Sequence, residues 1–308
     1  MTLPDWLATA LKNHRDTYAP VWRGFLSDHL PMTAMALWHQ GNSRPAIEAW
    51  MQTYQSQLVR LDSADDSTFE EAMGNPDKYA FLLRYFDEEI ARRGVNQTLQ
   101  AYLPKLVSGW VADAFHPLIR LGYGRRFDFA PEISAGLAYM AIKGPESSLL
   151  EISDDAIAGE ITWPVSQPLE GRTFDERARY YLRTSKPNVR IPDEPLLAYA
   201  RASLDVLNAT HNFFALHLVT ATHAFMFATQ GVEGISPAIL ATGLIAGYVT
   251  AGAPPFEPGV APTVFHTDFE HDIKLAFAVQ DLAERTGDEG FAAAARVYSS
   301  ELPAVDGA

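Results

Sequence analysis

The sequence predicts an all-α fold, a single multi-helix domain over residues 1–308. Apolar residues recur at three- and four-residue steps along most of the chain, as from Ile47 through Trp50, Tyr54, Leu58 and Leu61. No alternating strand pattern of useful length accompanies them. Hydrophobic residues make up 47% of the chain and charged residues 20%, so the chain can bury a large core.

The helical spacing repeats in separate segments along the first half of the chain. In order, we expect helices over residues 4–18, 31–40, 45–61, 78–94, 95–110, 117–121 and 131–141. Pro31 lies near the beginning of one helix, where proline is tolerated. Gly41 and the run Gly122-Tyr123-Gly124 are expected to end helices.

Residues 143–195 differ from the rest. They hold six of the 20 prolines, and their charges cluster without helical periodicity. This composition predicts a long Pro-rich connection with one or two short helices, which is a candidate lid. From Pro195 the helical pattern resumes, and we expect it to run nearly to the end of the chain.

Charge and composition exclude several classes of function. The formal net charge of −14 disfavours nucleic acid and anionic membranes as partners. The uncharged stretches after Asp205 and after Glu233 contain many polar residues or glycines, so we interpret them as buried helices rather than membrane spans. The N-terminus lacks the apolar stretch of a signal peptide, which leaves a cytoplasmic location as the expectation.

Common cofactor and catalytic motifs are missing from the sequence. Cysteine is absent, so thiolate metal sites and cysteine nucleophiles are excluded. The signatures of phosphate loops, serine hydrolases and zinc proteases are not found. Gly122-Tyr123-Gly124 is not followed by the remainder of a dinucleotide-binding fingerprint, so nothing supports NAD(P)H or a flavin.

The chain contains nine histidines, which are its main candidates for catalysis or metal binding. Without cysteine, a transition metal would need histidines, carboxylates or a modified lysine as ligands. His271 and Lys274 are three residues apart, which places them on the same face of a helix. They are either a surface pair or part of a site, and in a site the lysine must be neutral or carboxylated to bind a metal.

The remaining histidines differ in their surroundings. His211, His217 and His223 point in different directions on a helix, and His217 is the most deeply set among apolar residues. It is either a ligand or a hydrogen-bonded core residue. His29 and His116 stand beside prolines near helix beginnings, and each is either a ligand or a turn residue. Proline disfavours helical geometry in the residue before it, here His116. We expect an exposed His14, a helix C-terminal His39 and a His266 outside any metal site.

Four segments in order carry a resemblance to a known family. They are Ser27-Asp28-His29-Leu30-Pro31-Met32, Gly109-Trp110 through His116-Pro117-Leu118-Ile119 to Gly122, Leu216-His217-Leu218-Val219-Thr220, and His271-Asp272-Ile273-Lys274-Leu275. Together they resemble the questin-oxidase-like family. Its best-known members oxidatively open anthraquinone-type rings in fungal polyketide pathways, a reaction often described as Baeyer–Villiger-like. This chain is shorter than those members, so its substrate need not be theirs.

The resemblance implies an all-helical oxygenase with a mononuclear non-haem Fe(II). The family's ligands, four histidines and a carboxylated lysine, fall on His29, His116, His217, His271 and Lys274 of this chain. His39 and His223 are not expected among them. The implied reactants are dioxygen and a small aromatic substrate.

Further residues are candidates for the surroundings of the metal. Candidates for carboxylates that orient ligand imidazoles are Asp28, Asp113 and Asp272, and each is otherwise a surface charge. Candidates for a flat substrate pocket are Trp22, Phe115, Tyr123, Phe213 and Phe214, with Arg120 as a partner for a phenolate. Each of these is otherwise a core residue or a salt-bridge partner.

Two other functions stay open. A carboxylated lysine with histidines also suits a metal-dependent hydrolase that activates water. A helical binding protein that kept the fold without the metal is the second alternative.

Overall fold

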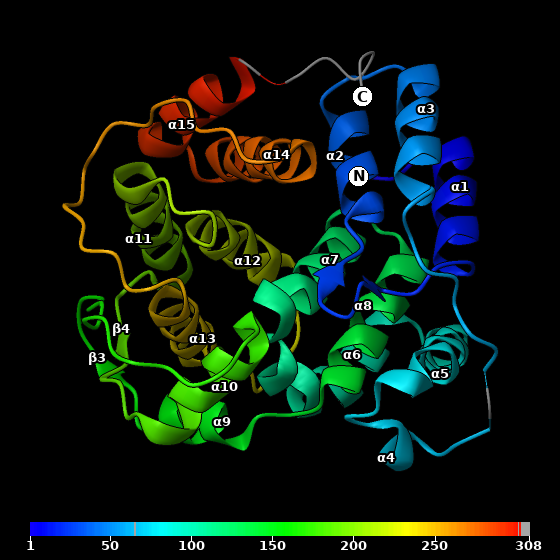
Figure 1. The fold of residues 1–308 in the computed structure, drawn as a ribbon, viewed down its shortest axis with the longest axis horizontal. Coiled ribbons are helices and arrows are strands. Elements are labelled where there is room, and N and C mark those ends of the chain that lie inside the picture. Colours follow the sequence, from blue (N-terminus) through cyan, green and yellow to red (C-terminus); the bar gives the residue numbers. More distant parts are fainter. Residues whose placement is uncertain (65, 301, 303–308) are drawn as a thin grey trace.

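A computed structural model describes residues 1–64, 66–300 and 302. These residues form fifteen α-helices, and their strands are limited to two pairs of two-residue strands. The expected all-α class is confirmed (Figure 1). Among the described residues, no helix is both long and apolar enough to cross a membrane.

The helices follow the sequence periodicity closely in the first half of the chain. Their bounds are α1 (Asp5–Arg15), α2 (Leu30–His39), α3 (Arg44–Gln55), α4 (Phe69–Ala72), α5 (Tyr79–Arg93), α6 (Val95–Leu106), α7 (His116–Arg126) and α8 (Ala130–Lys143). Strands β1 (Val21–Trp22) and β2 (Leu26–Ser27) form an antiparallel hairpin before α2. Short 3₁₀ turns lie at Pro76–Lys78, Val107–Gly109 and Ala112–Phe115.

The second half holds the remaining elements. They are α9 (Ser147–Asp154), β3 (Ile157–Ala158), α10 (Phe174–Thr184), β4 (Arg190–Ile191), α11 (Pro195–Thr210), α12 (Ala215–Ala228), α13 (Pro237–Thr250), α14 (Phe269–Thr286) and α15 (Glu289–Ser300). The connection over 143–195 thus contains two short helices as expected, and also the parallel pair β3–β4. The helical pattern after Pro195 is interrupted over residues 251–268, a break that was not predicted.

Helices α7 and α12 lie in the middle of the fold (Figure 1). Helix α7 packs on α8 and α12, while α12 also packs on α11, α13 and α14. Helix α14 reaches back to α2. One hydrophobic cluster runs through all of these helices, from Leu3 to Tyr298. The beginnings of α2, α7, α12 and α14 are thereby brought together although they are far apart in the sequence.

The expected break at Gly122-Tyr123-Gly124 is wrong, because α7 continues to Arg126. A Cβ on Gly122 would lie 2.5 Å from the Cα of Ala224 in α12, and one on Gly124 would lie 2.7 Å from the backbone nitrogen of Ile133 in α8. Glycine weakens a helix by about 0.5–1 kcal/mol relative to alanine. Here the glycines allow close packing of neighbouring helices instead of ending one.

Candidate metal centre

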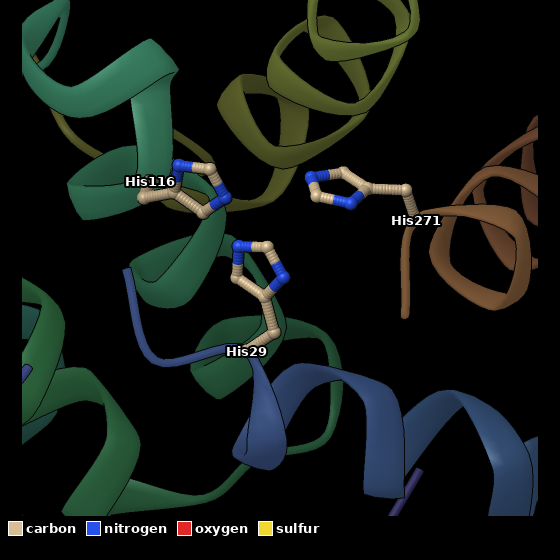
Figure 2. A group of neighbouring side chains, drawn as sticks. All are labelled: His29, His116 and His271. Carbon is tan, nitrogen blue, oxygen red and sulfur yellow. The ribbon is translucent and has the colours of Figure 1, made fainter. Parts of the chain in front are cut away.

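Four histidines from the beginnings of four helices meet in the interior. His29 is the residue just before α2, His116 is the first residue of α7, and His217 and His271 are the third residues of α12 and α14. Figure 2 shows the rings of His29, His116 and His271 turned toward one another. One nitrogen from each of these three lies within 4.8 Å of the others. Three histidines at this spacing could hold a metal ion.

His217 adjoins this group through His116 and His271, although it is not one of the three histidines whose nitrogens all lie within 4.8 Å of one another. Its ring centroid is 5.2 Å from that of His116 and 4.8 Å from that of His271. The Nε2 atoms of His217 and His271 are 3.1 Å apart. His29 stacks on His116 with centroids 4.6 Å apart and meets His271 edge-on at 4.5 Å. All four imidazoles predicted from the sequence are therefore neighbours.

Hydrogen bonds fix which nitrogen of three rings faces the cluster. The Nδ1 atoms of His116, His217 and His271 lie against the Asp113 carbonyl at 2.5 Å, the Phe213 carbonyl at 3.3 Å and the Asp268 carboxylate at 2.6 Å. Each acceptor is an oxygen, so each Nδ1 carries the proton and donates it. A neutral imidazole protonated there presents the Nε2 lone pair inward, which is the form that binds metals.

The contact between His217 and His271 has a clear consequence. With both rings neutral and protonated at Nδ1, two Nε2 lone pairs face each other at 3.1 Å. Such a contact is repulsive unless a cation lies between the nitrogens. Two imidazoles bound at right angles to one ion at about 2.1 Å place their nitrogens about 3.0 Å apart. The residues present therefore fit a bound transition metal.

Burial keeps the cluster uncharged. It lowers the pKa of His217 to about 3, and the nearby Lys274 ammonium acts in the same direction. Burial and Lys274 also lower the pKa values of His29, His116 and His271 well below the usual range. The positive ends of four helix dipoles point at the same place, and each disfavours an added proton. Neutral ligands are available at neutral pH.

Lys274 lies one turn along α14 from His271 and is 1% exposed. Burial lowers the pKa of its ammonium to about 8, against the opposing effect of Asp268, Glu270 and Asp28. Among the described residues, no hydrogen bond or ion pair to its amine is recorded. A buried amine with so low a pKa is partly neutral near pH 7 and can react as a nucleophile.

A wall of aromatic rings adjoins the histidines. The Phe213 ring, 39% exposed, lies 4.8 Å from that of His271 and 5.3 Å from that of His217. Phe213 contacts Phe214, which packs on Phe174 at 5.2 Å. Phe174 in turn meets Phe115 edge-on at 5.5 Å. The wall joins three of the expected substrate residues and runs from the solvent to the residue before His116.

The other expected substrate residues lie in different surroundings. Arg120 is buried in an ion pair with Glu132 and lies 3.9 Å from Asp28. Tyr123 packs against Phe127 and Phe277, toward His223 rather than the four-histidine cluster. Trp22 is partly buried in β1 beneath the guanidinium of Arg23. The structure records no ring contact between these side chains and the cluster within the described residues.

The expected orienting carboxylates act differently from the expectation. Asp113 orients His116 with its backbone carbonyl, not with its carboxylate. Asp272 binds His266 and Thr267, and Asp28 binds His14 and the amide of Leu30. None of the three carboxylates forms a recorded hydrogen bond to a ring of the cluster.

Sequence reasoning missed Asp268 and Phe174. Asp268 is the N-cap of α14, and its carboxylate accepts from both the amide and the Nδ1 of His271. An N-cap residue bonds the residue three positions later, so the spacing Asp268 to His271 is a signal that was available. For Phe174, the capping-box spacing Thr173 to Glu176 was a signal for the beginning of a helix, but not for the contact with Phe115.

Two expectations about individual histidines are wrong. His14 is 2% exposed, and its Nε2 is 2.8 Å from the Asp28 carboxylate. His116 has helical backbone angles despite the following proline. The unusual geometry lies just before it, where Asp113, Ala114 and Phe115 all have positive φ. Left-handed geometry costs roughly 1–2 kcal/mol per non-glycine residue, so the surrounding contacts must hold this turn in place.

A comparison with protein families matches the questin oxidase-like family over residues 26–180, just over half of the chain. The matched region contains His29, His116 and Phe174, while His217, His271 and Lys274 lie beyond it. No curated protein matches the chain. The family supports an oxidoreductase with a small-molecule substrate. The chain therefore belongs to the questin oxidase-like family.

Proposed function

We propose that this protein is a non-haem iron oxygenase that uses dioxygen to oxidise a small aromatic, polyketide-like substrate. Its Fe(II) ligands would be His29, His116, His217, His271 and a carboxylated Lys274. The observation that carries this proposal is the pair of inward Nε2 atoms 3.1 Å apart, on two rings whose Nδ1 protons are already engaged. Without a cation this arrangement is unfavourable, and with one it is a ligand pair.

Lys274 supplies the negative charge that the histidines lack. Its neutral amine attacks carbon dioxide, an N–C bond forms, and one proton leaves to solvent, giving a carbamate. The carbamate is an oxygen ligand of the carboxylate type, which suits ferrous iron in combination with imidazoles. Four neutral histidines and one carbamate would leave the Fe(II) site with a single net positive charge. Burying one net positive charge costs less free energy than burying two.

The bound iron would permit dioxygen to react with a substrate that supplies the electrons. The protein groups have separate tasks. Asp268 and the carbonyls of Asp113 and Phe213 hold three imidazoles in their metal-binding tautomer. The rings of Phe213, Phe214, Phe174 and Phe115 offer flat apolar faces for an aromatic substrate and exclude water.

Metal content tests the proposal most directly. Wild type, His217→Ala and His223→Ala would be produced in iron-supplemented medium and measured by elemental mass spectrometry. His223 is the matched control, because it is a buried histidine of the same helix that lies against Asp281 instead of the cluster. We expect close to one iron per chain in wild type and His223→Ala, and a large loss in His217→Ala.

A chain that binds no iron even after anaerobic reconstitution would contradict the proposal. With iron present, oxygen uptake would be followed with hydroxylated anthraquinones as probe substrates. Substrate turnover without oxygen consumption would favour the metal-dependent hydrolase instead. Mass spectrometry under native conditions tests the carbamate, which adds the mass of carbon dioxide that is lost in Lys274→Met.

A further inference from the structure

One buried phenol connects the two segments that carry His29 and His116. Tyr139, in the middle of α8, is 1% exposed, and its hydroxyl contacts Ser27 and Asp113. Ser27 lies two residues before His29, and Asp113 lies three residues before His116. No other side chain described in the structure has recorded hydrogen bonds to both of these segments.

The directions of these hydrogen bonds follow from the groups involved. The Tyr139 hydroxyl has a single proton and donates it to the Asp113 carboxylate, at 2.6 Å. The Ser27 hydroxyl, 3.0 Å away, must therefore donate to the Tyr139 oxygen. The Lys143 ammonium also lies 2.6 Å from the same Asp113 carboxylate oxygen. The phenol thus accepts a hydrogen bond from Ser27 and donates one to Asp113.

Asp113 needs such restraints. It is the first of three consecutive residues with positive φ, at 47°, 51° and 71° for Asp113, Ala114 and Phe115. The same residue orients His116, because its carbonyl accepts from Nδ1 at 2.5 Å. Rotation of the Asp113 backbone toward ordinary angles would move this carbonyl and the imidazole that it holds.

The hydrogen bond between Tyr139 and Ser27 acts on His29. Ser27 belongs to β2 and is followed directly by Asp28 and His29. The His29 and His116 rings are stacked, with centroids 4.6 Å apart and planes inclined by 10°. Their separation depends on how the β2 strand and the 113–115 turn are placed relative to one another.

We propose that the Tyr139 hydroxyl is a positioning group for the metal centre, which sets the spacing between His29 and His116 by holding Ser27 and Asp113 on one oxygen atom. This inference rests on the proposed function, since it assumes that the two histidines share a metal. Tyr139 itself does not contact the cluster and acts only through these two segments. Partners of metal ligands typically change metal affinity about 10–100-fold when removed.

Tyr139→Phe tests the inference, with Tyr199→Phe as the matched control. Tyr199 is also buried, and its hydroxyl donates to the Arg190 carbonyl at 2.8 Å, away from the cluster. Both variants lose one buried hydroxyl and should show similar drops in melting temperature without metal. We expect Fe(II) affinity, measured anaerobically against a competing chelator, to fall about 10–100-fold in Tyr139→Phe only. The visible bands of the Co(II)-loaded protein should shift in that variant and stay unchanged in Tyr199→Phe.

The outcomes separate the inference from the proposed function. Wild-type affinity and an unchanged Co(II) spectrum in Tyr139→Phe would overturn the inference while leaving the iron site in place. No metal binding by wild type and Tyr199→Phe would overturn the proposed function itself. If Tyr139→Phe does not fold, Ser27→Ala removes only the hydrogen bond between Ser27 and Tyr139. It should weaken Fe(II) binding and shift the Co(II) bands in the same direction, and unchanged values would again overturn the inference.

Discussion

Helices α12 and α14 carry two buried histidine sites of opposite character. At one site, His217 faces His271 and the buried Lys274, and no anion lies between the imidazoles. At the other, six residues farther along α12, the His223 Nε2 lies 2.9 Å from the Asp281 carboxylate. Arg126 and Arg285 bind the same carboxylate, at 2.6 and 2.9 Å.

The two sites differ in the charged groups that surround their histidines. Around Asp281 the buried charges are compensated, and its pKa is lowered by His223 and Arg126 against the effect of burial. His39 and Glu284 also approach Asp281 closely enough for a metal site, but the two guanidiniums already occupy its oxygens. Around His217 the imidazoles are held neutral, and the recorded carboxylate contact is that of Asp268 with His271. Two nitrogen lone pairs that face each other at 3.1 Å are tolerated most readily where a cation lies between them.

The largest expected effect comes from breaking the charge network around Asp281. Asp281→Asn leaves two arginines beside His223 without their anion, and removing one partner of a buried charge network costs about 3–5 kcal/mol. Urea denaturation should show this loss, while iron bound per folded chain stays as in wild type. Glu48→Gln is the control, because that carboxylate and its partner Arg44 are both exposed, 45% and 58%, and its loss should cost at most about 1 kcal/mol. Equal losses in the two variants would contradict this account of the site.

Acid should have the next largest effect, and it should act on the four-histidine cluster. The folded pKa of His217 is lowered to about 3, whereas an unfolded histidine titrates near 6.5. Below pH 6.5 the unfolded chain therefore binds more protons, and stability falls as the pH drops toward 3. Between pH 6.5 and 5 this costs about 2 kcal/mol from His217 alone. The other three histidines act in the same direction.

Urea titrations of the metal-free protein at several pH values check this. The free energy of unfolding should depend less on pH in His217→Ala than in wild type. In Asp281→Asn it should fall between pH 6.5 and 5 with the same slope as in wild type, because the four-histidine cluster is intact. A stability that does not change between pH 6.5 and 5 would show that the cluster is not held neutral.

The smallest effect is a gain in stability. Lys274→Met replaces a buried amine by an apolar side chain of similar length, which should stabilise the metal-free chain by about 1–2 kcal/mol. It should also abolish the carbamate and most of the iron binding. Calorimetry in carbon-dioxide-depleted buffer, beside iron analysis, measures both. Lys143→Met, at a partly buried lysine paired with Asp113, should not stabilise the chain. A loss of stability in Lys274→Met would indicate that the amine has a structural partner.

Much of the fold and the ligand set was accessible from the sequence. Helical periodicity gave most of the helices, because amphipathic spacing is a local property of the chain. His29, His116, His217 and His271 were identified by their positions near helix beginnings or in apolar surroundings and by family resemblance, and the structure brings all four together. Whether they and Lys274 bind iron stays a prediction.

The errors share a physical cause, which is that they depend on tertiary contacts. His14 was expected to be exposed, but Asp28, fourteen residues later, holds it in the interior. Gly122 and Gly124 suggested a helix end, but α8 and α12 pack against them. Phe174 joins the aromatic wall from the beginning of α10, inside the Pro-rich connection, through contacts with Phe115 and Phe214 that are distant in the sequence.

The placement of the four histidines at the beginnings of four different helices also bears on how the chain would unfold. The four histidines extend from residue 29 to residue 271, so an ion bound to all of them would close three long loops and act as a cross-link across most of the chain. Helices α2, α7, α12 and α14 could then separate only after the ion had left. The lifetime of the native state would be governed by the rate of metal release, and chelation would convert a slowly unfolding protein into a fast one.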